Sequence, residues 1–336
     1  FIGDESFKSN LTKIKIESLI KLDWMNEWAK GNSRSVNHEN LTTPMSLFAV
    51  TTHTAIGNND KDEINLAKNT LTKMASANFL LDTISRKELK NKPRCWKNGN
   101  PEAPCWYHAY EFARDAFTNY LIIAIYLKEY LTKEELKIVD TYIKKMHKKF
   151  IKPHQFSVAD KGFYAMGNGG IPNLAYANWA NDKKLAAKEF NFRFKNIEKV
   201  FYEDGYINNN SFRGYRGLWY HSYGLNSALG HLYLAKLWGA EVPETVIKKV
   251  TKAAKVLNLG IKDYEKFSSR KYDGDQLNNN YKKKNARMHT HQNAIAIDTL
   301  MKLVTGVILE NDPIYLRKRK KKGIDDLVGF NANCIK

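Results

Sequence analysis

The sequence predicts an all-α protein in which antiparallel helix hairpins stack into a single toroid or incomplete toroid. Three observations lead to this prediction. Apolar residues recur at helical spacing in most segments of the chain. The connections between the expected helices are mostly short, which favours antiparallel neighbours. Few stretches show the strict alternation of apolar and polar residues that strands require.

The chain is expected to form one domain over residues 1–336. No fixed-period repeat divides it, and no stretch is rich enough in Pro, Gly or Ser to act as a linker. A basic tail is expected over about residues 313–336, with its densest run at Arg317–Lys322. Such a run is typical of a solvated tail, and contact with nucleic acid is the alternative.

The apolar periodicity places the helices of the N-terminal half as follows. Helices are expected over residues 11–29, 44–56, 61–81, 106–130 and 132–150, with loops at 31–41 and 82–104. Asp60 is the expected N-cap of the third of these helices. Thr132 and Glu135 form a capping-box pattern that opens the last one.

The C-terminal half begins with an irregular, glycine-containing stretch after Pro153. Helices are then expected over residues 173–180, 182–202, 243–257 and 290–309. A further helix is expected to begin within residues 205–225 and to run to about residue 238. Pro243 suits the first turn of its helix. The polar segment 263–287 is expected to be a long loop.

The composition indicates a globular protein with an acidic partner. Hydrophobic residues make up 43% and aromatic residues 12% of the chain, which excludes a disordered protein. The longest apolar run, Tyr120–Leu127, is too short to cross a bilayer, so no membrane partner is expected. The net charge of +19 indicates nucleic acid, anionic polysaccharide or anionic lipid as the partner. The oligomeric state stays open.

The cysteines leave two alternatives open. Cys95 and Cys105 flank a short loop, and they either form a disulfide in an exported protein or remain buried thiols. No cysteine–histidine set has the spacing of a zinc site, so neither a metal nor a cofactor is expected. The chain begins with Phe1 and not with Met, so an N-terminal segment is expected to have been removed or left out.

The stretch Gly205–Leu225 holds the densest set of chemically useful side chains. Asp204 and Gly205 predict a turn, three asparagines follow, and the second half enters an apolar helix. The junction carries Arg213, Arg216, Tyr220, His221 and Tyr223. Two guanidiniums beside phenols and an imidazole suit an anionic ligand and proton transfer. The alternative is an aromatic helix start that packs into a core with arginines at its rim.

Other familiar sites are missing from the sequence. It has no glycine loop with lysine for phosphate, no HExxH and no GxSxG. His289 and His291 lack a third metal ligand, which favours a surface or substrate contact, and His108 suits a core position. His154, in the irregular stretch, is a candidate substrate contact.

The segment Arg216–Leu225, which reads RGLWYHSYGL, resembles the signature of the alginate lyase superfamily of polysaccharide lyases. The resemblance implies an (α/α) toroid and makes Arg216 and Tyr223 catalytic. The family also has an upstream Asn that is usually followed by His. Asn168 matches this Asn by spacing, but Gly169 stands where the His would be. The specific resemblance covers about residues 168–238, and it implies a periplasmic or secreted enzyme whose signal peptide is absent from this chain.

The residue types suit the β-elimination that the resemblance implies. Arg216 and Asn168 would donate hydrogen bonds to a uronate carboxylate while the C5 proton is removed. Tyr223 would transfer protons, with its anion stabilised by Arg213 and Arg216, because a phenol has an ordinary pKa of about 10. His221 would hold Tyr223 or act as the base itself. Tyr220 and Trp219 would stack on sugar rings or belong to the core.

The expected function is therefore cleavage of alginate, polymannuronate or polyglucuronate. Two alternatives are kept open. A glycoside hydrolase on a similar toroid would need two opposed carboxylates, for which Asp115 and Asp204 are the candidates. A basic nucleic-acid-binding protein would use the C-terminal run, but no recognisable module of that kind is present, so nucleic acid is an unlikely partner.

Overall fold

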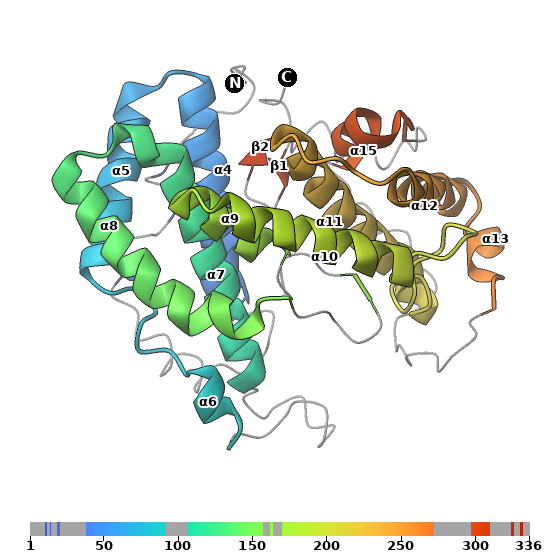
Figure 1. Cartoon of the computed structure of the whole chain (residues 1–336), viewed down its shortest axis with the longest axis horizontal. Helices are drawn as coiled ribbons and strands as arrows, with labels where there is room; N and C mark the ends of the chain where they lie inside the picture. Colours follow the sequence, from blue (N-terminus) through green and yellow to red (C-terminus); the bar gives the residue numbers. More distant parts are fainter. Residues whose placement is uncertain are drawn as a thin grey trace. The chain divides into compact units, whose positions relative to one another are not determined.

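The computed structural model describes residues 11, 14, 19–20, 38–91, 106–156, 162–163, 170–271, 297–309, 324–325 and 330–331 (Figure 1). Contacts between Cα atoms divide the chain into two compact units. The first comprises residues 1–155, 175–182 and 326–336, and the second comprises 156–174 and 183–325. Each unit therefore combines segments that lie apart in the sequence. The single toroidal domain stays a prediction.

The described part of the first unit is built from helices. They are η2 (His38–Thr42), α4 (Thr43–Gly57), α5 (Lys61–Ser76), α6 (Arg86–Leu89), α7 (Trp106–Leu127), η3 (Lys128–Tyr130), α8 (Lys133–Met146), η4 (His147–Ile151) and η5 (Lys152–His154). Helix α7 contacts both α4 and α5, and α5 contacts α8 (Figure 1). Helix α9 (Gly170–Ala180) begins in the second unit and ends in the first.

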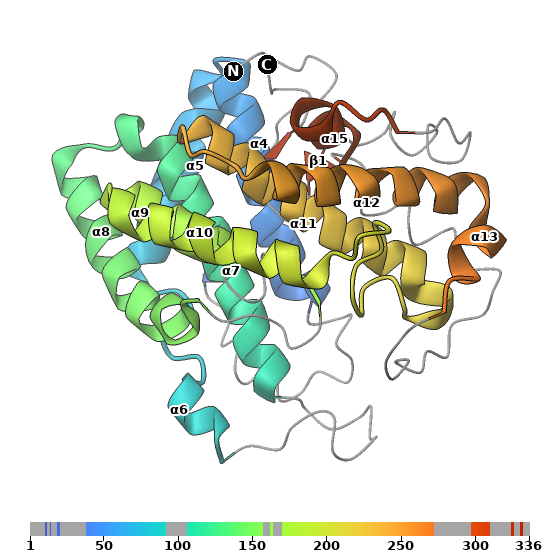
Figure 2. The same ribbon diagram turned by 45° about the vertical axis from the view of Figure 1, so that its right-hand side comes forward.

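The second unit is also helical. Its elements are α10 (Lys183–Val200), η6 (Gly214–Arg216), α11 (Gly217–Leu237), α12 (Glu244–Lys262), α13 (Tyr264–Ser268) and α15 (Ile297–Thr305). Helix α11 contacts α10, α12, α13 and α15, and Figure 2 shows α12 continuing into the short α13. The only strands among the described residues have two residues each, β1 (Ile324–Asp325) and β2 (Phe330–Asn331). The prediction of an all-α protein is confirmed.

Local capping explains where several helices begin, as the sequence predicts. The Asp60 side chain accepts a hydrogen bond from the backbone N–H of Glu63 at 3.1 Å and opens α5. The predicted capping box opens α8. Its Thr132 hydroxyl accepts from the Glu135 N–H at 3.2 Å, while the Glu135 carboxylate accepts from the Thr132 N–H at 2.8 Å.

Some predicted boundaries were wrong. Helix α5 ends at Ser76 and not near residue 81, because Asn78 and Leu80 take left-handed backbone angles (φ 50° and 60°) that stop a right-handed helix. The loop expected over 82–104 contains α6, and the loop expected over 263–287 contains α13. The last helix is described only over Ile297–Thr305.

Buried tyrosines tie the helices of the first unit together. The Tyr120 hydroxyl donates to the Leu71 carbonyl at 3.1 Å, and the Tyr142 hydroxyl donates to the Phe79 carbonyl at 2.6 Å. Burial raises the pKa of both phenols well above the ordinary value. These groups are therefore neutral donors to a carbonyl within α5 and to one in the turn that follows it.

Several predictions lie outside the described residues. They concern most of the first helix over 11–29, Cys95, Cys105, Asn168, Gly169, His289, His291 and the run Arg317–Lys322. A helix with the length and hydropathy to cross a membrane does not occur within the described ranges.

Candidate functional site

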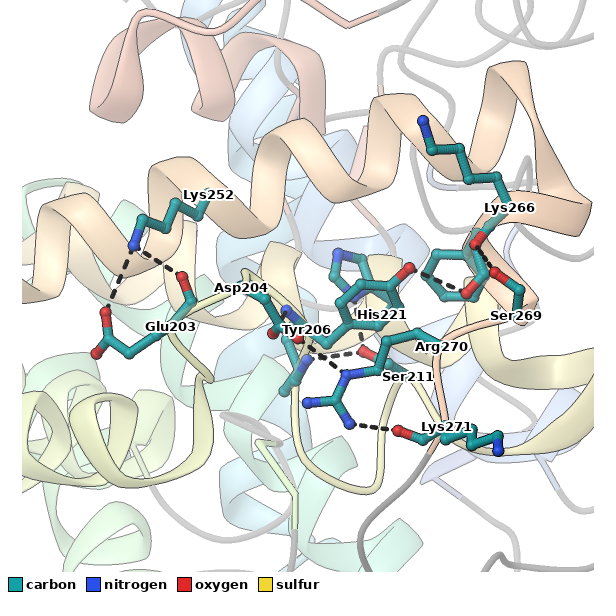
Figure 3. A network of polar contacts seen from close by, with 12 residues as sticks. Glu203, Asp204, Tyr206, Ser211, His221, Lys252, Lys266, Ser269, Arg270 and Lys271 are labelled. Atoms are coloured by element: carbon teal, nitrogen blue, oxygen red, sulfur yellow. Dashed lines mark hydrogen bonds and ion pairs between the residues drawn. The ribbon is translucent and has the colours of Figure 1, made fainter.

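A looped segment, residues 201–216, leads into α11 and carries the predicted turn. Phe201 and Ile207 form an isolated antiparallel bridge, and the turn between them includes Asp204 and Gly205. Arg270, which follows α13 in the sequence, binds this turn through its guanidinium group. Its Nε donates to Asp204 at 2.9 Å (Figure 3), and its guanidinium lies over the rings of Tyr202, Tyr206 and Phe212, 5.0–5.7 Å from their centroids. The turn is thus fixed by a residue 66 positions away in the sequence.

His221 is completely buried, and both of its ring nitrogens are hydrogen bonded. Nε2 lies 2.9 Å from the Ala253 carbonyl, which can only accept, so Nε2 carries the proton. Nδ1 then accepts from the Ser211 hydroxyl at 2.8 Å (Figure 3). That hydroxyl accepts from the Ile207 N–H at 2.7 Å. Burial lowers the pKa of His221 to about 4. The imidazole is therefore neutral and connects the loop, α11 and α12.

The helix register divides the start of α11 into two faces. We call Gly217, Leu218, His221, Gly224 and Leu225 the buried face, because all five are buried. We call Arg216, Trp219, Tyr220 and Tyr223 the half-buried face, because all four are partly exposed. The second set follows the spacing i, i+3, i+4 and i+7, which places side chains on one side of a helix.

Arginines and aromatic rings form a continuous cluster on the half-buried face. The Arg213 guanidinium lies 4.0 Å from the centroid of the Tyr220 ring, and that of Arg216 lies 5.2 Å from the Trp219 ring. The two rings are themselves 4.7 Å apart between centroids. We call these four residues the guanidinium–aromatic cluster. It presents positive charge and ring surface together, and Tyr223 lies on the same face one turn further along.

The structure brings together five of the eight predicted site residues on the loop end and the half-buried face of α11, and it places a sixth, His221, on the buried face. Arg213, Arg216, Trp219, Tyr220, His221 and Tyr223 all lie on the loop end and the first two turns of α11. His154 closes η5 in the first unit, and Asn168 is outside the described residues.

The carboxylates of the hydrolase alternative gain no support. Asp115 belongs to the first unit, where it lies 3.7 Å from the buried Arg114 guanidinium, and Asp204 belongs to the second, where it is paired with Arg270. Each carboxylate thus lies beside a cationic side chain of its own unit.

Sequence reasoning missed a buried polar cluster in the second unit. The Glu189 carboxylate accepts from Arg193 Nε at 2.8 Å and from Asn173 Nδ2 at 2.7 Å, and all three side chains are buried. Burial raises the pKa of the Glu189 carboxyl even with the guanidinium beside it. Burial and the charge of Arg193 lower the pKa of the buried His231. The i, i+4 spacing of Glu189 and Arg193 was visible in the sequence, but their burial was not.

A hollow of about 470 Å³ lies in the first unit, lined by Ile20 and residues 77–82, none of which is a predicted site residue. Within the described ranges, no three His, Cys, Asp or Glu side chains lie where they could hold a metal ion. Comparison of the chain with family models, curated proteins and solved structures found no significant match.

Proposed function

We propose that this protein is a polysaccharide lyase that cleaves a uronic-acid polymer by β-elimination. The observation that carries the proposal is the guanidinium–aromatic cluster on the half-buried face of α11, with Tyr223 on the same face. Guanidiniums bind carboxylates in a planar, two-pronged geometry, and aromatic rings offer surface to the apolar faces of sugars. The net charge of +19 suits a polyanionic substrate.

The proposed reaction removes the proton on C5 of a uronate and expels the sugar linked through O4. The electron pair of the C5–H bond forms the C4–C5 double bond, the C4–O4 bond breaks, and O4 takes up a proton. Arg216, together with Asn168, stabilises the charge that builds on the carboxylate. Tyr223 accepts the C5 proton and then donates it to O4. Arg213 binds a further anionic group of the polymer or supports the phenolate.

His221 has a revised role in this proposal. We expected it to hold Tyr223 or to act as the base. Its two nitrogens instead contact Ser211 and Ala253, and its side chain has no exposed surface. A general base must reach the proton that it abstracts, directly or through one water. We therefore assign proton transfer to Tyr223 alone and give His221 the task of holding the loop against α11.

The resemblance of Arg216–Leu225 to the alginate lyase superfamily also supports the proposal, and with it the toroidal fold and a periplasmic or secreted location. The test is a panel of alginate blocks, polyglucuronate and neutral controls, followed by ultraviolet absorbance. β-Elimination produces an unsaturated uronide that absorbs, whereas hydrolysis and simple binding produce no such chromophore. Release of reducing ends without new absorbance would replace the lyase by a hydrolase.

A further inference from the structure

Asn210 binds three backbone groups of two residues of the second unit, Phe163 and Tyr220. Its Oδ1 accepts from the Phe163 N–H at 2.9 Å, and its Nδ2 donates to the Phe163 carbonyl at 3.3 Å and to the Tyr220 carbonyl at 3.0 Å. The Asn210 side chain has no exposed surface. The three hydrogen bonds of the amide therefore all go to the protein backbone.

The approach of Asn210 to α11 depends on glycine. A Cβ atom on Gly224 would lie 2.5 Å from Asn210 Nδ2, and one on Gly217 would lie 2.3 Å from the Ser211 carbonyl oxygen. Positions i and i+7 fall on the same side of a helix. Residues 210–211 thus pack directly on the bare backbone of the buried face, closer than any side-chain-bearing residue would allow.

One of the segments that Asn210 joins carries the proposed binding groups. Tyr220, whose carbonyl it binds, carries the ring under the Arg213 guanidinium, and Arg213 follows Asn210 by three residues. Phe163, its other partner, is held against the same loop by both of its backbone groups. We propose that Asn210 is a positioning residue of the lyase site, which sets the loop arginine relative to Tyr223. This inference rests on the proposed function.

The chemistry of the amide makes the proposal specific to asparagine. An aspartate at position 210 would keep the acceptor for the Phe163 N–H but would place an oxygen against the two carbonyls that Nδ2 now serves. An alanine would leave all three backbone groups buried without this partner. Misplacement of reacting groups by about 1 Å lowers turnover by about 100-fold. We therefore expect a defect in kcat for Asn210→Ala and Asn210→Asp, and little change in KM.

The experiment compares these two variants with Asn258→Ala and with the wild type. Asn258 is a matched control, because its Nδ2 also donates to a backbone carbonyl of the second unit, that of Ile308, at 2.8 Å. Steady-state kinetics on the best uronate gives kcat and KM, and hydrogen–deuterium exchange of the peptide that contains Phe163 reports whether the connection has opened. We expect faster exchange and about 100-fold lower kcat in both Asn210 variants, with KM within about threefold, and neither effect in Asn258→Ala.

Each of the other possible outcomes contradicts a specific part of the proposal about Asn210. Faster exchange with wild-type kcat would show that Asn210 only stabilises the loop and would overturn the positioning role. Unchanged exchange in both variants would overturn the connection itself. A defect confined to KM would turn Asn210 into a binding residue and would also overturn the proposal. A wild-type protein that gives no unsaturated product on any uronate would refute the lyase function, and the positioning role with it.

Discussion

The two faces at the start of α11 differ in what their polar groups contact. On the buried face, the imidazole of His221 binds only Ser211 and Ala253, and Gly217 and Gly224 leave room for the backbone and side chain of the loop. On the half-buried face, the guanidiniums lie over aromatic rings, and the residues that carry them are partly exposed. One short stretch of sequence therefore supplies both the support and the proposed reactive groups. Substitutions on the two faces should produce different kinds of defect.

The largest expected effect is that of Tyr223→Phe on turnover. The phenol is assigned to proton transfer, which contributes only in the transition state, so kcat should fall to background while polymer binding stays nearly intact. Turnover and binding are measured on the same sample. Tyr233→Phe is the control, because Tyr233 is a partly exposed tyrosine further along α11. Wild-type turnover in Tyr223→Phe would remove this residue from the mechanism.

Arg216→Lys should be the next most severe change on the half-buried face. A lysine keeps the charge but cannot address both carboxylate oxygens in one plane, and it could lose its proton beside a second cation. Loss of one such donor should cost roughly 2.7–4 kcal/mol, or about 100- to 1,000-fold in turnover. The melting temperature should stay close to that of the wild type.

Arg86→Lys, at an exposed arginine of the first unit, is the control for the same exchange outside the site. If Arg216→Lys retains most of its activity, Arg216 is a rim residue and the half-buried face loses its catalytic role. Parallel losses of activity and stability would instead assign Arg216 to the support of the fold.

The burial of His221 should make the free energy of unfolding depend on pH. The pKa of His221 is lowered from 6.5 to about 4 in the folded protein. Between these values the unfolded chain binds a proton that the folded chain does not, so the stability present above pH 6.5 is lost as the pH falls toward about 4. The lost free energy of unfolding is on the order of a few kcal/mol.

Denaturant unfolding of the wild type and of His221→Gln over this pH range isolates the contribution of His221 from those of other buried histidines. The variant should be less stable near neutral pH, because the loop contact is damaged, but it should lose less stability on acidification. If the free energy of unfolding changes with pH by the same amount in both proteins, His221 is not the neutral, buried group that the contacts describe.

The sequence predicted those parts of the fold that depend on neighbouring residues. The capping box of Thr132 and Glu135 needs only a three-residue spacing, and the start of α8 was correct for that reason. Helix α12 was predicted to end at residue 257 but continues to Lys262. The helix includes Gly260, a residue that usually weakens helices. Here the missing Cβ leaves the space that Leu218 and Phe267 occupy against the helix backbone. That contact is tertiary, so no local pattern could show it.

The same distinction applies to the candidate site. The positions of Arg216 and Tyr223 on one face follow from their spacing of seven residues, and both were predicted. The partners of Asn210 and Asp204 were not predicted, because Phe163 and Arg270 are 47 and 66 residues away in the sequence. Local spacing thus accounts for the face that carries the proposed reactive groups, whereas the residues that hold it in place required three-dimensional contacts.

The smallest expected effect is that of Arg213→Gln, and it tests whether the charge of the half-buried face matters for binding. Arg213 lies over Tyr220 and is partly exposed, so its attraction for an anionic polymer is weakened by solvent. We expect KM to rise by about two- to fivefold and kcat to change little. In the wild type, KM should rise with ionic strength because salt screens the attraction, and the variant should show a weaker dependence. Lys248→Gln is the control, since Lys248 already pairs with Glu244 on an exposed face of α12, at 2.7 Å. A wild-type KM that does not respond to salt would mean that the cationic cluster contributes nothing to recognition, and the contrast between the two faces would then rest on Tyr223 and Arg216 alone.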